Sequence, residues 1–341
     1  MHFLAIETSC DETAVALLEL EGRQGSRREP KLLAEEISSQ VELHQDYGGV
    51  VPELAAREHM RNLPLLVDKL LGDRGLSLKD CGAIAVTRGP GLKGCLLMGV
   101  CFAKGVSVAT DAALVGVNHI EGHLLAPLMD NPDLEFPFLA LVVSGGHTEI
   151  VEVRGLGDYV ILARTIDDAA GEAFDKSANL LGFPYPGGAG LAALADAQQS
   201  SRFKLPRVMR AAKGFSFSGL KTAVSVLVKQ HQAHLDDPSI KGELAYAIQD
   251  AIVDALCFKL KKAVKASGIR RVAVSGGVSA NQCLRARIRE MKGVSLYLPS
   301  FGHCMDNAAM IGHVGALRYA RGDRLPLDAD VLSRWPVEEI R

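Results

Sequence analysis

Two stretches of the chain repeat one order of apolar and polar positions. Residues 3–18 run from an apolar segment through a polar turn into a second apolar segment. Residues 138–153 follow the same order, with a turn that opens at Ser144. Short apolar segments joined by a polar turn predict β-hairpins, and their recurrence predicts an internal duplication. We therefore expect two related lobes that face each other across a cleft.

Outside these hairpins the pattern alternates between helical and extended periods. Apolar residues recur at helical spacing over 52–71 and over 242–265, and Gly268 is placed to end the second helix. Short apolar runs that predict buried strands occur at 83–86, 113–117 and 271–274. Strands that alternate with helices, together with two hairpins, predict an α/β protein with mixed sheets.

Composition and charge narrow the function classes. The chain has 341 residues and a formal net charge of -2, so it has no overall positive charge that would attract nucleic acid. Its seven cysteines are scattered without a CxxC pair, which indicates a reducing, cytoplasmic compartment rather than a disulfide framework. The most apolar stretch, residues 92–117, contains Lys93, Lys104 and Asp111, and therefore predicts a core helix and a strand rather than a membrane span.

Contact with RNA would depend on local groups of basic residues. Two such groups occur, although charge clusters of this kind more often form a solvated face. They are Arg23, Arg27, Arg28 and Lys31 in the loop 22–31, and Arg202, Lys204, Arg207, Arg210 and Lys213.

His119 and His123 are spaced to share one face of a helix and to bind one metal ion. The alternative is a pair of surface or capping histidines. Glu121 does not form an HExxH motif and would face away from the pair, which disfavours a zincin-type peptidase. A third ligand must come from elsewhere. Asp306 is a candidate, although its place before an apolar helix also suits an N-cap.

Turns of small residues are candidates for binding phosphate. Ser144-Gly-Gly and Ser275-Gly-Gly both follow apolar strands, and paired glycines let backbone N–H groups approach an anion closely. Asp175 suits hydrogen bonds to ribose, and Asp11 and Glu12 in the first hairpin turn suit acid–base work. Each has a plainer alternative as a tight turn, a solvated helix start or a turn-forming side chain. The chain lacks the P-loop and dinucleotide-binding glycine motifs, which argues against those enzyme classes.

Taken in order along the chain, the motifs form a set. Together they resemble the TsaD/Kae/Gcp family of tRNA adenosine threonylcarbamoyltransferases over nearly the whole length. The resemblance is carried by the segments Ile6–Thr13, Tyr47–Glu53, Gly89–Leu92, His119–His123, Val143–Thr148, Asp167–Lys176, Tyr185–Gly188, Phe215–Lys221, Ser275–Asn281 and Asp306–Ala309.

The resemblance implies both a fold and an activity. The fold would be the duplicated, two-lobed ASKHA fold of actin, sugar kinases and Hsp70, with mixed sheets and a central cleft. We place one lobe at residues 1–118 plus 312–341 and the other at 119–311. The activity would be transfer of a threonylcarbamoyl group from threonylcarbamoyl-AMP to N6 of the adenosine at position 37 of tRNAs that read codons beginning with adenine.

The resemblance also implies site residues and partners. His119, His123 and Asp306 would bind one divalent metal ion, Fe(2+) in the first place and Zn(2+) as the alternative. Asp11 and Glu12 would be catalytic or close to the metal. Besides tRNA and threonylcarbamoyl-AMP, the partners would be a TsaB-type paralogue and a TsaE-type ATPase. The adenylate would be held by Val142, Val143, Ser144, Gly145, Gly146, Asp175, Gly188 and Asn281.

Two other function classes stay open on the sequence. A non-catalytic nucleotide-binding scaffold, like the smaller paralogue of this family, would be expected to lack His119 and His123. A metallopeptidase would need a water-activating glutamate beside the two histidines, and the sequence places none there.

Overall fold

The computed structural model describes residues 1–20, 30–207 and 212–340 of the chain. The chain forms two compact units, each built around its own five-stranded sheet. The first unit consists of Met1–Asp130, Leu156–Asp158 and Asp306–Arg341, and the second consists of Asn131–Gly155 and Tyr159–Met305.

The division between the units follows helix packing. Helix α4 (His119–Asp130) packs against α11 (Ala308–Arg321) and belongs to the first unit, whereas the lobe boundary expected from the sequence lies between residues 118 and 119. At the other end of the second unit, the division falls after Met305 rather than after residue 311. As a result, α4 and Asp306 are parts of one compact unit.

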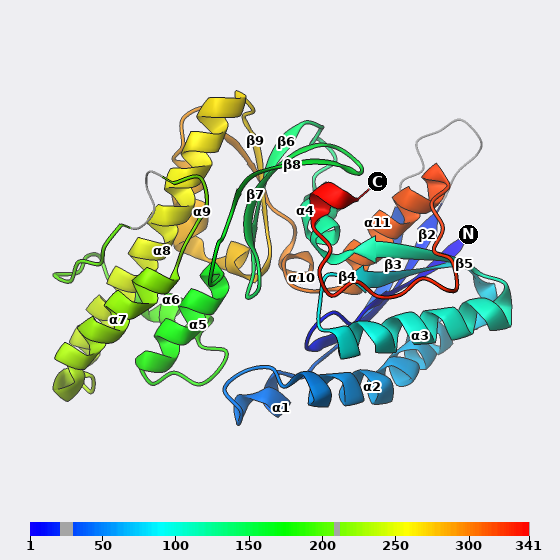
Figure 1. Cartoon of the computed structure of the whole chain (residues 1–341), viewed down its shortest axis with the longest axis horizontal. Coiled ribbons are helices and arrows are strands. Elements are labelled where there is room, and N and C mark those ends of the chain that lie inside the picture. Colours follow the sequence, from blue (N-terminus) through cyan, green and yellow to red (C-terminus); the bar gives the residue numbers. More distant parts are fainter. Residues whose placement is uncertain (21–29, 208–211, 341) are drawn as a thin grey trace. The chain divides into compact units, whose positions relative to one another are not determined.

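The sheet of the first unit is mixed, in the order β3-β2-β1-β4-β5 (Figure 1). β1 and β2 form the predicted hairpin, and β3 continues the antiparallel arrangement. β4 and β5 join the other side of β1 in parallel. The strands are β1 (His2–Glu7), β2 (Glu12–Leu20), β3 (Pro30–Ser39), β4 (Cys81–Gly89) and β5 (Ala113–Asn118).

Helices lie on both faces of this sheet, because successive residues of a strand point to opposite sides. Ile6 of β1 belongs to a buried cluster with Leu63 of α2 and Leu96 of α3. Phe3, on the other face of β1, meets Tyr319 of α11, with the ring centroids 5.2 Å apart. Besides α4 and α11, the helices are α1 (Val41–Gln45), α2 (Pro52–Gly72) and α3 (Lys93–Thr110), with 3₁₀ helices η1 (Leu78–Asp80) and η4 (Val337–Glu339).

Among the described residues, α3 is the one helix that is long and apolar enough to cross a membrane. Its inner face carries Leu96, Val100 and Ala103, which are buried in the core of the first unit. The helix also packs against α2 and β4. Its apolar character is therefore that of a core helix, as the charges in this stretch predict.

The second unit repeats the arrangement of the first. Its sheet has the order β10-β9-β6-β7-β8. In the reverse direction, from β8 to β10, this is the same order as in the first sheet, with β6 in the place of β1 and β7 in the place of β2. β6 pairs antiparallel with β7 and parallel with β9. This confirms the predicted duplication and the mixed sheets. The strands are β6 (Phe138–Val143), β7 (Thr148–Gly155), β8 (Asp158–Arg164), β9 (Arg271–Ser275) and β10 (Ser295–Tyr297).

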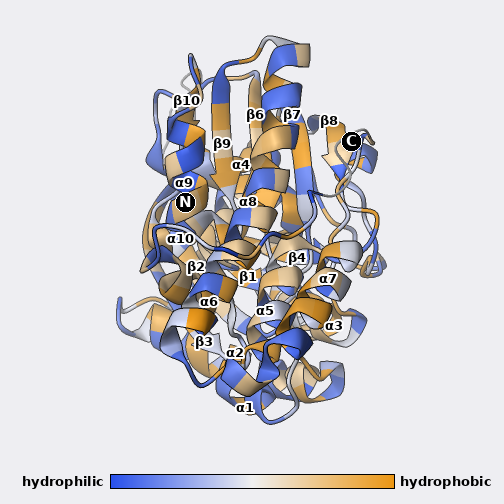
Figure 2. Ribbon diagram, turned by 90° about the vertical axis from the view of Figure 1, so that its left-hand side faces the viewer, coloured by the Kyte–Doolittle hydropathy of each residue, from blue (hydrophilic) through white to orange (hydrophobic). Residues whose placement is uncertain are grey.

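The core of the second unit is organised by α8 (Pro238–Ser267). The side chain of Asp237 caps its start by accepting a hydrogen bond from the Ser239 N–H at 2.9 Å. Gly268 ends the helix in the left-handed conformation, as predicted. The apolar stripe of α8 packs with β6 and β9, whose hydrophobic residues are visible in Figure 2. The other helices are α5 (Ala170–Leu180), α6 (Gly188–Asp196), α7 (Ser218–Gln230), α9 (Gln282–Arg289) and α10 (Phe301–Cys304), with 3₁₀ helices η2 (Gln232–His234) and η3 (Gly277–Ala280).

Candidate functional site

The first histidine of the predicted pair opens a helix. β5 ends at Asn118, whose Oδ1 accepts hydrogen bonds from the backbone N–H groups of Ile120 at 2.9 Å and Glu121 at 3.1 Å. This contact satisfies donors that the first turn of a helix leaves without partners. The start of α4 is thereby fixed at the carboxyl end of β5, and His119 and His123 lie one turn apart on one face of the helix.

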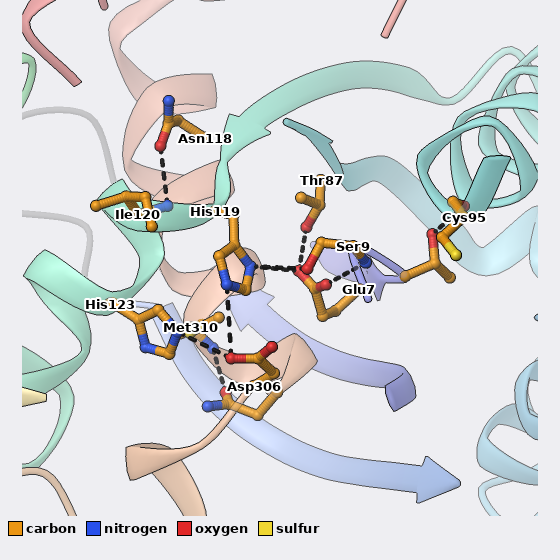
Figure 3. A network of polar contacts seen from close by, with 12 residues as sticks. Glu7, Ser9, Thr87, Cys95, Asn118, His119, Ile120, His123, Asp306 and Met310 are labelled. Carbon is orange, nitrogen blue, oxygen red and sulfur yellow. Dashed lines mark hydrogen bonds and ion pairs between the residues drawn. The ribbon is translucent and has the colours of Figure 1, made fainter. Parts of the chain in front are cut away.

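The structure brings both histidines and Asp306 together (Figure 3). Oδ1 of Asp306 lies 2.9 Å from Nε2 of His123 and 3.5 Å from Nε2 of His119. One ligand atom from each of the three residues lies within 4.8 Å of the others. The histidines are buried, whereas the Asp306 side chain is 23% exposed. The residues predicted as metal ligands therefore form one compact group that keeps some access to solvent.

Asp306 and its neighbour Asn307 divide two roles that the sequence left open. Asn307 is the N-cap of α11, because its Oδ1 accepts a hydrogen bond from the Met310 N–H at 2.8 Å. The carboxylate of Asp306 instead points at the imidazole rings. The alternative interpretation of Asp306 as the helix cap is therefore wrong.

A further carboxylate, Glu7, contacts this group and was not selected from the sequence. It ends β1, is only 1% exposed, and places Oε2 3.2 Å from Nδ1 of His119. The backbone N–H of Ser9 donates to its Oε1, and the hydroxyl of Thr87 donates to its Oε2, both at 2.5 Å. The sequence contains one indication of such a role. An acidic residue directly ends an apolar run, and a carboxylate that is buried needs a partner.

The charged groups of this cluster shift one another's pKa. Burial by itself would lower the pKa of His119, but Asp306 and Glu7 raise it well above its ordinary value. Burial by itself would raise the pKa of Asp306 and of Glu7, but His119 holds both below their ordinary values. The two carboxylates thus favour positive charge at this place, which a bound cation would supply.

The donor set fits a divalent ion. Two imidazoles and one carboxylate are ligands that zinc and non-haem iron both accept. The buried Nδ1 of His123 has no hydrogen-bond partner among the described residues, so this ring can reorient toward an ion without losing a bond there. Burial, followed by the charges of Asp11 and Asp306, raises the pKa of Glu12 to about 9. A bound cation would reduce the electrostatic repulsion among the carboxylates of Asp11, Glu12 and Asp306.

Asp11 lies in the turn that joins β1 to β2, as the hairpin pattern predicts, and Glu12 is the first residue of β2. His59 holds this turn from α2, because its Nε2 lies 2.9 Å from the carbonyl oxygen of Cys10 and its Nδ1 lies 2.8 Å from the Thr13 hydroxyl. The acid–base role of Asp11 and Glu12 stays a prediction.

Glu121 pairs with a residue of α11. Both of its carboxylate oxygens accept hydrogen bonds from Arg318 of α11, Oε2 from Nε at 2.6 Å and Oε1 from Nη2 at 2.7 Å. Both side chains are buried. This confirms that Glu121 faces away from His119 and His123. A carboxylate held in this way does not serve as the water-activating base of a peptidase.

In the second unit, the predicted glycine turn lies at the carboxyl end of β6. Ser144 and His147 close it through two hydrogen bonds, from the Ser144 N–H to the His147 carbonyl at 2.8 Å and from the His147 N–H to the Ser144 Oγ at 3.1 Å. The start of α5 packs against the turn so tightly that a Cβ on Gly171 would lie 2.6 Å from the Ser144 carbonyl oxygen. Gly145 and Gly146 are exposed, and no described atom lies within 4 Å of an added Cβ on either.

The turn after β9 meets the same strand. Gly276 has a φ of +86°, and a Cβ there would lie 2.5 Å from the carbonyl oxygen of Val143. Only glycine satisfies both the backbone conformation and the close approach. Val142, Val143, Ser144 and Gly276 thus lie at one edge of the sheet, where the parallel strands β6 and β9 end. Ligands of open α/β sheets commonly bind at such an edge.

Asp175 and Gly188 also lie together, although neither is near the other in sequence. Oδ1 of Asp175 accepts a hydrogen bond from the Gly188 N–H at 2.8 Å, at the start of α6, and burial raises the pKa of Asp175. Asn281 caps α9 by accepting from the Leu284 N–H at 2.9 Å, and its Nδ2 donates to Gln249 at 2.6 Å. Contact of these residues with an adenylate stays a prediction.

The basic groups proposed for RNA contact are only partly described. Outside the described residues lie Arg23, Arg27, Arg28 and Arg210. Arg202 pairs with Glu243 at 3.3 Å, and Arg207 pairs with Asp250. Two arginines of the second group therefore take part in ion pairs within the second unit.

Comparison with known proteins identifies a family that the sequence matches and solved structures with a similar fold. The sequence profile described as "TsaD: tRNA N6-adenosine threonylcarbamoyltransferase" matches residues 31–313. Component A of (R)-2-hydroxyglutaryl-CoA dehydratase from Acidaminococcus fermentans is similar in structure, with a TM-score of 0.54 at 15% identity over 94% of this chain and 97% of that chain. The activator of 2-hydroxyisocaproyl-CoA dehydratase from Clostridium difficile, solved with ADPNP, has a TM-score of 0.51 at 16% identity over 94% of both chains.

Full-length HypF, in a phosphate- and nucleotide-bound form, has a TM-score of 0.59 at 13% identity over 94% of this chain and 46% of that chain. At these identities the structural likenesses establish the fold alone. With the repeated sheet order, they show that this chain has the duplicated ASKHA fold predicted from its motifs.

Proposed function

This chain belongs to the TsaD family of tRNA N6-adenosine threonylcarbamoyltransferases, and on that premise we propose that it makes threonylcarbamoyladenosine in tRNA. The threonylcarbamoyl group would pass from threonylcarbamoyl-AMP to N6 of adenosine 37, in tRNAs that read codons beginning with adenine, and AMP would be released. The observation that carries the proposal is the group formed by His119, His123 and Asp306, with ligand atoms within 4.8 Å of one another. A non-catalytic nucleotide-binding scaffold would not need such a group.

The chemistry of the donor defines what the protein must supply. Threonylcarbamoyl-AMP is a mixed anhydride, so the acyl group is already activated and no Ser or Cys nucleophile is needed. The adenine amine is a weak nucleophile because its lone pair is delocalised into the ring. The protein must therefore position that amine, polarise the carbamoyl carbonyl and stabilise the departing phosphate.

His119, His123 and Asp306 would hold the metal ion, which we assign as Fe(2+), with Zn(2+) as the alternative. A bound divalent ion supplies Lewis-acid chemistry, which withdraws electron density from a carbonyl or phosphoryl oxygen. Three protein ligands leave coordination positions for substrate oxygens. Asp11 and Glu12 are assigned to accept and pass on the proton that leaves N6.

The adenylate part of the donor is assigned to the second unit. The turn at Ser144, Gly145 and Gly146 exposes backbone amides that can donate to phosphate oxygens. Asp175 is oriented by the Gly188 N–H and has a second carboxylate oxygen that suits ribose hydroxyls. Val142, Val143 and Asn281 would complete the adenylate site from the ends of β6 and β9.

Family membership also supports the remaining assignments. We assign tRNA as the acceptor, a TsaB-type paralogue and a TsaE-type ATPase as protein partners, and the cytoplasm as the location. The transferase is favoured over a metallopeptidase because both carboxylate oxygens of Glu121 are engaged by Arg318.

The test measures threonylcarbamoyladenosine by mass spectrometry of tRNA nucleosides, after the purified protein and its two partner proteins have reacted with threonylcarbamoyl-AMP and unmodified tRNA. His119→Ala combined with His123→Ala should abolish the product. His234→Ala, which removes an exposed histidine of the second unit, should leave it unchanged. Normal modification by the double variant would reject the metal-dependent transfer, and cleavage of a protein substrate without tRNA would favour a peptidase.

A further inference from the structure

We propose that Glu7 is a positioning residue, which holds the ring of His119 so that Nε2 is the nitrogen presented to the metal ion. The inference rests on the metal centre of the proposed function. Glu7 would not be a ligand itself, because its carboxylate contacts Nδ1 of His119, while Nε2 of the same ring faces Asp306 (Figure 3).

The geometry defines what each ring nitrogen of His119 faces. Oε2 of Glu7 lies 3.2 Å from Nδ1 of His119, and Oδ1 of Asp306 lies 3.5 Å from Nε2. An ionised carboxylate only accepts hydrogen bonds, so it selects the ring form with hydrogen on Nδ1. Asp306 faces Nε2 in the same way while no ion is bound, but an ion held by Asp306 would take up the lone pair of Nε2, and only the hydrogen on Nδ1 would then remain. Histidines that bind metal commonly donate their other N–H to a carboxylate in this way, which orients the ring and raises its basicity.

Glu7 is itself held in place by two further donors. Ser9 donates its backbone N–H to Oε1, and Thr87 donates its hydroxyl to Oε2. The parallel register of β1 and β4 places Ile6 beside Val86, so the next residues along the two strands, Glu7 and Thr87, are neighbours. Donors from the turn, from β4 and from α4 thus fix both oxygens of a carboxylate that is only 1% exposed.

The two histidines differ in this respect. His119 has contacts at both ring nitrogens, whereas Nδ1 of His123 is buried and has no hydrogen-bond partner in the described part of the chain. Ser9 Oγ also lies 3.2 Å from Nδ1 of His119, but a hydroxyl can donate or accept and so does not select one ring form. The orienting role therefore falls to Glu7.

The decisive variant is Glu7→Gln, which keeps the size of the side chain but removes its charge. The amide group can donate to Nδ1, which would place the ring hydrogen on Nε2 and block coordination there. Co(2+) is titrated into the metal-free protein and followed by visible absorption, and Zn(2+) affinity is measured against a competing chelator. We expect the variant to bind both ions about 10- to 100-fold more weakly, with an altered Co(2+) spectrum.

Glu149→Gln is the matched control. Glu149 is a carboxylate of β7 in the second unit, is 4% exposed, and accepts a hydrogen bond from Arg164 at 2.6 Å. The same chemical change therefore falls on another buried strand carboxylate that does not contact a ligand. This variant should bind Co(2+) and Zn(2+) as the wild type does.

Thr87→Val provides a second route if Glu7→Gln does not fold. It leaves the carboxylate of Glu7 but removes one of its donors, so metal affinity should fall in the same direction and by less. Thermal unfolding of each metal-free variant separates loss of fold from loss of ligand geometry, because a purely structural role would not alter the Co(2+) spectrum of the folded protein.

Wild-type affinity and an unchanged Co(2+) spectrum in Glu7→Gln would overturn the inference while leaving the proposed function in place. Failure of the wild-type protein to bind either ion would overturn the metal centre, and the inference with it. Weakened binding in both Glu7→Gln and Thr87→Val, with normal binding in Glu149→Gln, would establish the orienting role.

Discussion

Glu121 and Arg318 form a buried, two-point ion pair that ties α4 to α11. Nε and Nη2 of the arginine donate to the two carboxylate oxygens at 2.6 and 2.7 Å, and the side chains are 0% and 5% exposed. His119 and His123 lie on α4, and Asp306 shortly precedes α11. The pair therefore joins α4, which carries two of the candidate metal ligands, to α11, which begins shortly after the third.

Loss of this pair should destabilise the protein strongly. Arg318→Met should lower the free energy of unfolding by about 3–5 kcal/mol, because the buried carboxylate of Glu121 would lose both hydrogen bonds from Arg318. Urea denaturation of the metal-free protein measures the change. Glu53→Gln breaks an exposed pair with Arg57, whose side chains are 76% and 66% exposed, and should change stability by less than about 0.5 kcal/mol. Equal losses in the two variants would contradict the importance of burial.

Asp306 and Asn307 should give opposite results when they are replaced separately. Asp306→Asn should abolish retention of a metal ion, because it removes the charged ligand. Asn307→Ala should retain the ion but lower the free energy of unfolding by about 1 kcal/mol, the usual cost of losing an N-cap. Metal content by elemental mass spectrometry, with denaturation of both variants, checks this. Complete metal loss in Asn307→Ala would contradict the division of roles between these neighbours.

The glycine turn after β6 should depend on a residue that lies outside it. A Cβ on Gly171 would lie 2.6 Å from the Ser144 carbonyl oxygen and 2.8 Å from the Gly145 nitrogen, so Gly171→Ala should displace the turn. We expect AMP affinity to fall by about tenfold or more, because a lost hydrogen bond to a charged group costs about 1.5–3 kcal/mol. Isothermal titration with AMP measures this.

Gly219→Ala is the control for that experiment. Gly219 lies in the first turn of α7, and no described atom lies within 4 Å of an added Cβ. AMP should bind this variant as it binds the wild type. If Gly171→Ala also binds AMP normally, the assignment of phosphate to the Ser144 turn is wrong.

Asp250 should make stability depend on pH in the acid range. Arg207 and Arg287 each contact one of its carboxylate oxygens. Burial by itself would raise the pKa of Asp250, but the two arginines hold it below its ordinary value. A carboxyl group with a lowered pKa in the folded state stabilises the protein above its unfolded pKa, and that stability is lost as the pH falls through the folded pKa.

The corresponding experiment compares the wild type with Asp250→Asn by urea denaturation across the acid range. The difference in free energy of unfolding should be constant near neutral pH and should shrink below about pH 4, the pKa region of an unperturbed aspartate. A difference that grows on acidification would show that the arginines do not stabilise the ionised form of Asp250.

Local periodicity was sufficient to predict the main elements. The hairpins at 3–18 and 138–153 are confirmed as β1–β2 and β6–β7, and the helices at 52–71 and 242–265 are confirmed within α2 and α8. These elements could be read from the chain because alternation of apolar residues reflects which side of a strand or helix is buried.

The functional residues could be predicted only in part from local sequence patterns. Spacing alone suggested His119 and His123, since residues four apart share a helix face. Spacing did not separate Asp306 from its neighbour Asn307, because either suits a helix start and the histidine contact spans 183 positions of sequence. The segment around Glu7 shows an acidic residue at the end of an apolar run, but nothing in it indicates that Thr87 and His119 lie beside that residue.

The amino-acid sequence by itself determined the order of elements, their duplication and the chemical types available as ligands, because these depend on residues close together in the chain. Only the tertiary structure decided that Glu7 contacts Nδ1 of His119, that Asn307 rather than Asp306 caps α11, and that Arg318 forms an ion pair with Glu121. Each of these choices depends on strand register or helix packing, which bring together groups from distant segments, and a buried polar group is stable only with the partner that such packing supplies.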